Sequence, residues 1–307
     1  MFIKGCIGSL QQLSNFNALL IMKSVLIFIC VCFSLASIHA QSFNPKFFCF
    51  SDAFSRSVYT NDPVAQAKLL KELGFDGIEM SAGSPEQNDK KLEAVYQQNL
   101  KVFMVWAKVD LEASEAIDPR LYDLIPKLKD KGATVWVHIN SKSRAPSDPT
   151  GDSICISILQ KLADYANNYG VRIALYPHHG DWLIKVGHAV ELTQKVNRRN
   201  LGAVFNLCHY LKLEDRAQLE TELTRAVPYL FSVSINGADD GDTNNMEWDR
   251  LIQPLGKGSF DVLKVLKILK DNQYEGPIGL QCYALKEKPQ DHLRTSMASW
   301  KKYMKKL

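Results

Sequence analysis

Short apolar segments recur along the chain, and longer amphipathic segments lie between them. Eight of the apolar segments are rich in β-branched and aromatic residues, at 47–51, 75–80, 100–106, 133–139, 171–176, 201–206, 230–236 and 277–282. Each is nearly continuously apolar, which is typical of a strand that is covered on both faces. The intervening segments carry helix signals: Asp62-Pro63 precedes an amphipathic stretch that ends at Leu73-Gly74. Similar signals predict helices over 118–131 and 152–169.

Eight consecutive strand–helix units predict an α/β fold, a single (β/α)8 TIM barrel. The strand starts lie 25 to 47 residues apart, and each interval is long enough for one such unit. A doubly wound open sheet is the structural alternative, but its usual Gly-rich first turn is missing after Phe50, where the chain reads Ser-Asp-Ala-Phe-Ser. No linker or change of composition divides the sequence, so we expect one barrel domain over 41–307.

The first 40 residues have a different pattern. Lys23 precedes an apolar run over 25–36, and the small residues Ala36 and Ala40 lie at or after its end. This order is typical of a secretory signal peptide, here with an upstream extension. The run is too short to span a bilayer, which takes about 20 apolar residues. We therefore expect an exported protein, periplasmic or extracellular, without a stable membrane anchor.

The net charge of the chain argues against a nucleic-acid partner. Residues 1–40 hold two lysines and no acid, so the remaining 267 residues have a formal net charge of +2. A nearly neutral surface gives no electrostatic footprint for nucleic acid. We expect a small molecule as the ligand and no nucleic-acid partner.

Titratable side chains concentrate where the predicted strands end, and in a barrel these ends form one mouth. His138, His178 and His209 are candidates there for acid–base chemistry or, if a metal is bound, for its ligands. His178 is followed by His179, and neighbours on an extended chain point to opposite sides. We therefore expect only His178 to face the mouth.

Glu79 is the one carboxylate inside a predicted strand near its end. It is a candidate general base, and an ion pair with Lys108 or Lys142 is the equally weighted alternative. Neutral polar and aromatic side chains at the mouth suit sugar hydroxyls and ring faces. The candidate sugar-binding residues are Trp106, Lys108, Lys142, Tyr176, Asn206, Asn236 and Gln281.

Four short motifs occur in an informative order: Leu-Gly-Phe-Asp-Gly-Ile-Glu at 73–79, Gly-Val-Arg-Ile-Ala-Leu at 170–175, Asn-Leu-Cys-His at 206–209 and Gln-Pro-Leu-Gly-Lys-Gly-Ser-Phe-Asp at 253–261. With these motifs the chain resembles the sugar phosphate isomerase/epimerase superfamily, the xylose isomerase-like TIM barrels, over roughly residues 47–305. The resemblance implies a divalent metal held by Glu, Asp, His and Glu on strands five to eight, with the two glutamates moving a proton beside a carbonyl.

The chain departs from that pattern at all four positions, where Tyr176, Asn206, Ser234 and Gln281 stand instead. These residues remove about three negative charges from a site that needs anionic oxygen ligands. Two readings stay open: a sugar isomerase, epimerase or keto-sugar lyase with relocated machinery, and a non-catalytic carbohydrate-binding barrel. DNA repair in the manner of endonuclease IV is disfavoured by the charge and the expected export.

Overall fold

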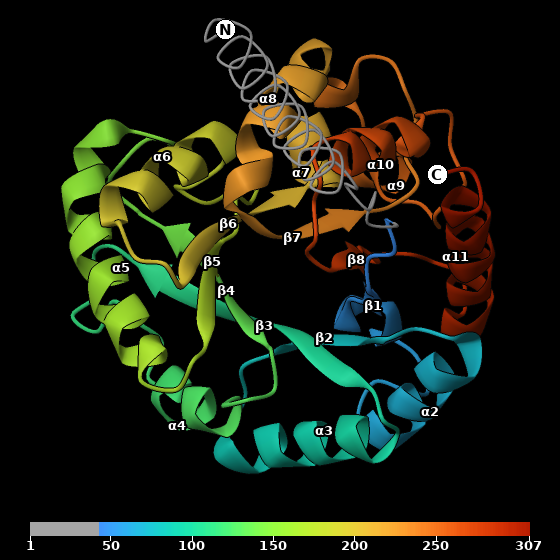
Figure 1. The fold of residues 1–307 in the computed structure, drawn as a ribbon, viewed down its shortest axis with the longest axis horizontal. Coiled ribbons are helices and arrows are strands. Elements are labelled where there is room, and N and C mark those ends of the chain that lie inside the picture. The colour runs from blue at the N-terminus through green and yellow to red at the C-terminus, as the bar shows by residue number, and fades with distance from the viewer. Residues whose placement is uncertain (1–42) are drawn as a thin grey trace, which may run out of the picture. The chain divides into compact units, whose positions relative to one another are not determined.

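The computed structural model describes residues 43–307, so the predicted signal peptide and its upstream extension lie outside the described residues. Eight parallel strands pair in chain order and close into a barrel, as Figure 1 shows at the centre of the molecule. Their bounds are β1 Phe47–Cys49, β2 Gly77–Ser81, β3 Lys101–Asp110, β4 Thr134–Asn140, β5 Arg172–Leu175, β6 Leu201–Asn206, β7 Leu230–Ile235 and β8 Ile278–Leu280. The predicted single (β/α)8 barrel is confirmed.

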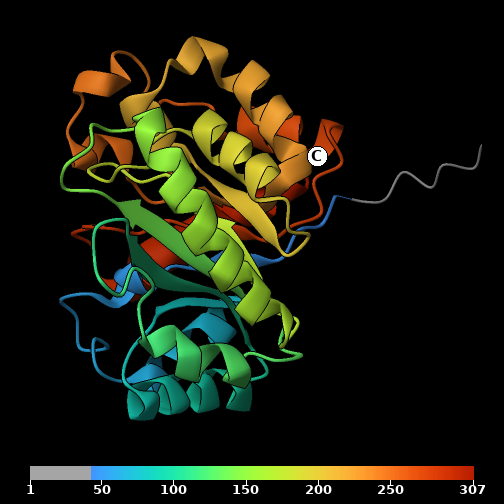
Figure 2. The same cartoon turned by 90° about the vertical axis from the view of Figure 1, so that its left-hand side faces the viewer.

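Helices surround the strands, and Figure 2 shows the long helix α5 crossing the outside of the barrel. The α-helices are α2 Pro63–Leu73, α3 Pro85–Gln97, α4 Arg120–Lys127, α5 Asp152–Asn167, α6 Val186–Val196, α7 Leu207–Leu213, α8 Leu219–Ala226, α9 Trp248–Leu251, α10 Val262–Asp271 and α11 Pro289–Met304. Short 3-10 turns are η1 Ser51–Phe54, η2 Pro149–Gly151, η3 Arg216–Gln218, η4 Val227–Tyr229 and η5 Thr243–Asn245.

Local signals account for several of the helix ends. The Asp62 side chain accepts a hydrogen bond from the Ala65 N–H at the start of α2, and Gly74 ends that helix with φ of 90°. The helix predicted over 118–131 is shorter than expected. Pro126 lies inside α4 and supplies no N–H to the helix, so the helix ends at Lys127 and turns follow.

Two apolar cores hold the barrel together. The larger one lies between strands and helices, and the smaller one fills the barrel interior with mainly aromatic side chains. Its members are Phe48, Phe50, Phe103, Met104, Trp136, Ala174, Tyr176 and Val204. Because these rings fill the interior, open space remains only toward the strand ends.

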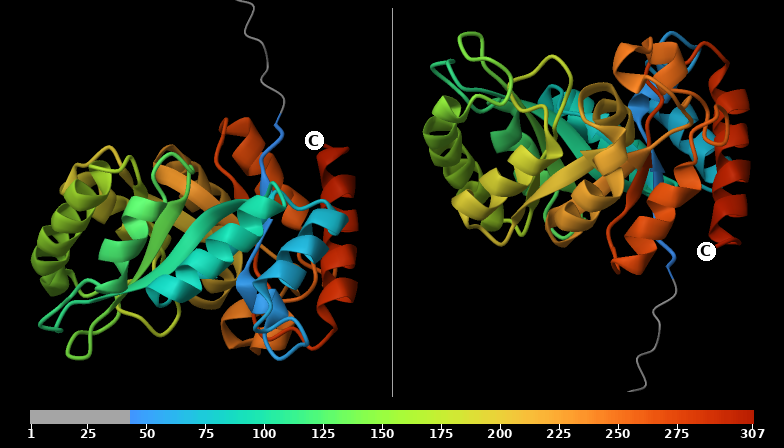
Figure 3. Two further views of the ribbon diagram at one scale, coloured as in Figure 1. Left: turned by 90° about the horizontal axis from the view of Figure 1, so that it is seen from below. Right: turned by 90° about the horizontal axis from the view of Figure 1, so that it is seen from above.

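The ring of helices closes where the domain begins and ends. Helix α11 packs against α2, and Figure 3 shows the two helices side by side from two directions. Strand β1 pairs with β8, and Trp300 of α11 stacks on Phe47 of β1 with ring centroids 4.2 Å apart. None of the helices between residues 43 and 307 combines the length and apolarity needed to cross a membrane.

Candidate active site

A cavity of about 430 Å³ opens where the strands end. It is lined by residues that follow β1, by residues of β2 and the middle of β3, and by the segments after β5, β6, β7 and β8. These residues are Phe50, Ser51, Asp52, Glu79, Ser81, Trp106, Tyr176, His178, His179, His209, Trp248, Ile252, Gln281 and Tyr283. This is the face of the barrel where βα loops build active sites.

Glu79 is the buried acid of this cavity. It lies on β2, and its Oε2 accepts hydrogen bonds from the backbone N–H and the hydroxyl of Ser51 at 3.0 and 2.9 Å. Burial, together with the nearby charge of Asp52, raises the pKa of Glu79 to about 7, although the Ser51 hydrogen bonds act in the opposite direction. The carboxyl therefore titrates near neutrality, as a general base should.

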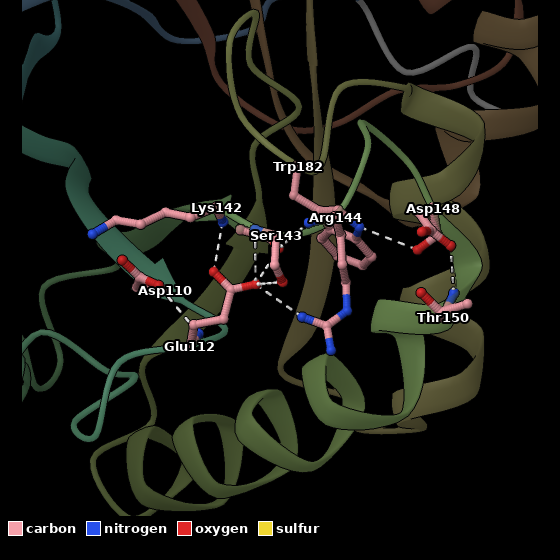
Figure 4. A network of polar contacts seen from close by, with 9 residues as sticks. Asp110, Glu112, Lys142, Ser143, Arg144, Asp148, Thr150 and Trp182 are labelled. Atoms are coloured by element: carbon pink, nitrogen blue, oxygen red, sulfur yellow. Dashed lines mark hydrogen bonds and ion pairs between the residues drawn. The ribbon is translucent and has the colours of Figure 1, made fainter.

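The alternative of an ion pair between Glu79 and Lys108 or Lys142 is contradicted within the described residues. The Lys108 ammonium lies 3.2 Å from the Asp110 carboxylate, and Lys108 does not line the cavity. Lys142 belongs to the network in Figure 4, where its backbone N–H donates to Glu112 at 2.5 Å. Neither lysine is therefore placed to contact a ligand in the cavity.

Three imidazoles line the opposite part of the cavity. His178 and His179 both contribute, so the expectation that only His178 faces the mouth is wrong: β5 ends at Leu175, and the chain turns at these residues. The His179 N–H donates to Nδ1 of His209 at 3.5 Å. Burial, with the neighbouring His178 and His179, holds the pKa of His209 well below its usual range, so its ring is neutral.

His138 lies behind this group and does not line the cavity. Its Nδ1 is 2.9 Å from Oδ2 of Asp181, and its ring stacks on Trp106 at 4.5 Å. Burial raises the pKa of Asp181, but the hydrogen bond with His138 and the proximity of His178 lower the pKa by more, and the net shift is downward. Asp181 is thus an ionised carboxylate shared by two imidazoles.

Tyr176 and Asn206 form a pair below the imidazoles. Tyr176 lines the cavity, and its ring stacks on Trp136 with centroids 4.8 Å apart. The Asn206 amide donates to the Tyr176 hydroxyl, while its Oδ1 accepts from the N–H groups of Cys208 and His209 at the start of α7. Asn206 does not line the cavity, so its contacts are with the protein itself.

Asn236 and Gln281, the two remaining candidates, differ in whether they line the cavity. Asn236 is fully buried and donates to the carbonyls of Gly237 and Leu251, and it does not line the cavity. Gln281 lines the cavity, and its Oε1 accepts from the backbone N–H groups of Cys282 and Tyr283 at 2.8 and 2.9 Å. Its amide nitrogen is therefore the end left for a ligand.

Three residues of the site are not among the candidates predicted from the sequence. Ser51 follows β1 directly and gave no signal apart from its place at a strand end. Asp181 lies in the turn after β5, where the sequence reads His-His-Gly-Asp over 178–181, and this acidic neighbour of two histidines was a usable signal. Trp248 opens the short helix α9 in the long loop after β7, and only the tertiary fold brings it to the cavity.

The model of the Xylose isomerase-like TIM barrel family matches residues 67–303. The chain belongs to this family. An inosose isomerase of Halalkalibacterium halodurans is 24% identical over 132 residues, which are 42% of this chain and 45% of that enzyme. The chain thus matches under half the length of that curated relative.

Solved structures of the family share the fold. A 3-keto-D-glucoside 4-epimerase from E. coli is 16% identical with a TM-score of 0.67, over 86% of this chain and all of that one. A D-psicose 3-epimerase from Clostridium cellulolyticum H10 is 14% identical with a TM-score of 0.64, over 84% of this chain and 98% of that one. At these identities the likeness shows the fold alone.

The residues at the four metal positions implied by the family resemblance do not fit a divalent cation. Burial raises the pKa of Tyr176 well above its ordinary value, so its phenol stays protonated. The side-chain oxygens of Asn206 and Gln281 each accept from two backbone N–H groups. Ser234 supplies a neutral hydroxyl. Such a donor set has no charge to offset the loss of the ion's hydration shell.

A site rebuilt from imidazoles is not assembled either. Within residues 43–307, no group of three or more His, Cys, Asp and Glu side chains is arranged to hold a metal ion. His138 is directed to Asp181, outside the cavity lining that His178 and His209 share.

Proposed function

We propose that this member of the family is a carbohydrate isomerase or epimerase that moves a proton on a carbon beside the carbonyl of a sugar or keto-sugar. The relatives named above are an inosose isomerase, a 3-keto-D-glucoside 4-epimerase and a D-psicose 3-epimerase, and these activities support the class of reaction. Because the implied metal positions carry neutral side chains, the proton transfer is assigned to other groups of the cavity.

The observation that carries the proposal is the Glu79 carboxyl, which faces the cavity with a pKa of about 7. A base with this pKa is ionised in a large fraction of molecules at neutral pH and still accepts a proton readily. Ser51 fixes the carboxylate through two hydrogen bonds to Oε2. Preorganisation of this kind keeps a base within reach of a substrate C–H bond.

His209 is suited to hold the developing negative charge on the carbonyl oxygen. Its Nδ1 accepts from the His179 N–H, so in the neutral ring the proton is on Nε2. A neutral imidazole that donates from Nε2 can polarise a carbonyl without transferring its own proton. In this assignment His209 takes the part that a metal ion plays elsewhere in the family.

The lining also indicates an uncharged substrate. Of the described residues around the cavity, none is a lysine or an arginine, and two are the acids Asp52 and Glu79. Phosphate and carboxylate groups are ordinarily recognised through such cations. Trp106, Trp248 and Tyr283 offer aromatic surface of the kind that packs against a sugar ring.

The test is hydrogen exchange in D2O, followed by proton NMR, with inosose, D-psicose and a 3-keto-D-glucoside as probes. The wild-type protein is expected to replace a C–H beside the carbonyl of at least one probe with deuterium. Glu79→Gln is expected to slow that exchange about 10²–10⁴-fold, the range of general-base catalysis. Glu115→Gln, the same change at an exposed glutamate outside the cavity, is the matched control and should exchange at the wild-type rate.

Two results would contradict the proposal. Saturable binding of a probe by calorimetry, with no exchange of any probe at high protein concentration, would establish a carbohydrate-binding barrel instead. Preferred turnover of the phosphorylated form of a probe would contradict the uncharged substrate.

Export is part of the same proposal and rests on the sequence pattern before residue 41. With the chain expressed in a bacterium that has a general secretion pathway, the processed protein is expected to begin at Gln41 or close to it. N-terminal sequencing of the protein from the periplasm and the medium is the measurement. Recovery of the unprocessed chain in the cytosol alone would contradict export.

A further inference from the structure

The cavity has two chemically different sides. In a closed ring of eight strands, β2 lies three strands from β5 and four strands from β6, so both of these strands are on the far side of the barrel from β2. Glu79 is on β2, whereas His178 follows β5 and His209 lies in α7 directly after β6. A sugar in the cavity therefore has the carboxylate on one side and the imidazoles on the other.

Asp181 is the carboxylate beside the His178 ring. Its Oδ2 lies 3.5 Å from Nδ1 of His178, within ion-pair distance, and that buried nitrogen makes no hydrogen bond to the described residues. The His178 side chain is nevertheless 32% exposed and lines the cavity, so the ring edge with Nε2 is the edge turned to the open space. Asp181 is itself 8% exposed and is held by His138 at 2.9 Å.

We infer that His178, oriented by Asp181, is a second proton carrier opposite Glu79, so that the enzyme inverts a stereocentre beside the carbonyl. This inference rests on the proposed function and narrows it to epimerisation. A single base returns the proton to the face from which it came. Two carriers on opposite sides of a flat intermediate deliver it to the other face.

The step balances without an outside reactant. In one direction the Glu79 carboxylate takes the proton from the carbon beside the carbonyl, the C–H bond breaks, and its electron pair forms an enediolate. His209 donates a hydrogen bond to the enediolate oxygen. The His178 imidazolium then gives its Nε2 proton to the opposite face of the same carbon, and a new C–H bond forms. Glu79 is left protonated and His178 neutral, and both return to their starting states by exchange with water.

Isotope exchange with both epimers separates two carriers from one. The probes are a 3-keto-D-glucoside and its C4 epimer, and D-psicose and its C3 epimer, in D2O. Glu79→Gln and His178→Gln are each expected to slow inversion about 10²–10⁴-fold. Each variant should still exchange deuterium into one epimer of the active pair. Glu79→Gln should retain exchange of the epimer whose C–H faces His178, and His178→Gln should retain exchange of the epimer whose C–H faces Glu79.

Asp181→Asn tests the positioning role. It is expected to reproduce the His178→Gln pattern in weaker form: slower exchange of the epimer that faces His178, unchanged exchange of the other epimer, and a small change in KM. Asp181→Glu, which keeps the carboxylate, should recover part of the lost rate. Asp148→Asn is a matched control, because this half-buried carboxylate accepts from the Thr150 N–H and lies outside the cavity.

Failure of the proposed function and failure of this inference give different results. Wild-type protein that exchanges no probe overturns the proposed function itself. Wild-type exchange that is lost for both epimers in Glu79→Gln and retained for both in His178→Gln leaves the function standing but overturns the second carrier. Equal slowing of both epimers by Asp181→Asn, with a lowered melting temperature, assigns Asp181 a structural role and overturns its part in the inference.

Discussion

At the scale of single residues, the protonation of Glu79 is set mainly by its burial and by two neighbours, Asp52 and Ser51, whose effects on its pKa are opposite. Removal from water and the proximity of Asp52 both favour the neutral carboxyl, while the two hydrogen bonds from Ser51 favour the carboxylate. The balance leaves a pKa of about 7. A base that must be ionised to act is thus held at the edge of the physiological range, where small changes in its surroundings change the active fraction.

The first prediction concerns this balance. Ser51→Ala removes the hydroxyl that donates to Glu79 at 2.9 Å and leaves the backbone N–H in place. Because that bond favours the charged form, its loss raises the pKa of Glu79 further. The rise of kcat/KM with pH, which follows ionisation of the base, should move about one to two units higher, since a hydrogen bond to a charged group contributes about 1.5–3 kcal/mol.

The measurement is kcat/KM between pH 5 and 9 for wild type and variant on the probe that shows exchange. Ser81→Ala is the control, because Ser81 also lines the cavity but donates no hydrogen bond to Glu79. Its profile should coincide with that of the wild type. A Ser51→Ala profile that stays in place or moves to lower pH would remove Glu79 from the role of base.

At the scale of elements, strands β5 to β8 keep the barrel fold although the implied metal positions after them carry neutral side chains. The side chains at the implied metal positions are engaged with the protein itself, since Asn206 caps α7 and Gln281 accepts from the turn after β8. An amide can accept these backbone hydrogen bonds because it keeps the shape and the acceptor oxygen of a carboxylate without its charge. The two amides thus hold the start of α7 and the turn after β8 through their own hydrogen bonds.

The second prediction follows from this arrangement. Adding Mn²⁺ or Zn²⁺, or treating the protein with EDTA, should leave its melting temperature and its exchange rate unchanged, because a ligand that does not bind the native state cannot stabilise it. Differential scanning fluorimetry and the D2O assay are the measurements, with a family enzyme that carries the four acidic and imidazole ligands as the positive control. A stoichiometric metal whose removal lowers both quantities would contradict the fit argued from the donor set.

The same elements explain which site residues the sequence could indicate. Glu79, His178 and His209 were found because parallel strands bring their ends to one mouth, and an end is visible as the close of an apolar run. Lys108 and Lys142 are predicted by the same rule, but Lys108 lies within the long strand β3 and pairs with Asp110 of that strand, and Lys142 does not line the cavity. Trp248 was missed because its approach depends on the path of a long loop.

At the scale of the whole molecule, the fold follows from the sequence more fully than the site does. All eight strands fall within two or three residues of the apolar segments that predict them, except that β3 extends to Asp110. Their count and spacing leave few alternatives to a closed ring. The strand count predicts the closure of the barrel only indirectly, because the pairing of β1 with β8 joins segments from opposite ends of the domain.

The seam between β1 and β8 is covered by α11, whose Trp300 stacks on Phe47 of β1. The indole is 7% exposed and stacks on Phe47 with an interplanar angle of 6°. Both seam strands have three residues, so few backbone hydrogen bonds join them to their neighbours. The packing of α11 should therefore contribute much of the stability of the closed barrel.

Trp300→Ala is accordingly expected to lower the free energy of unfolding by about 3–5 kcal/mol, the range for truncating a buried aromatic ring. Trp300→Phe, which keeps an aromatic ring against Phe47, should cost less than the alanine variant. Val58→Ala, at a side chain that is 92% exposed, is the control and should change little. Urea unfolding followed by circular dichroism is the measurement. If Trp300→Ala unfolds at the wild-type urea concentration, the seam is held by its short strands and the stabilising role of α11 is excluded.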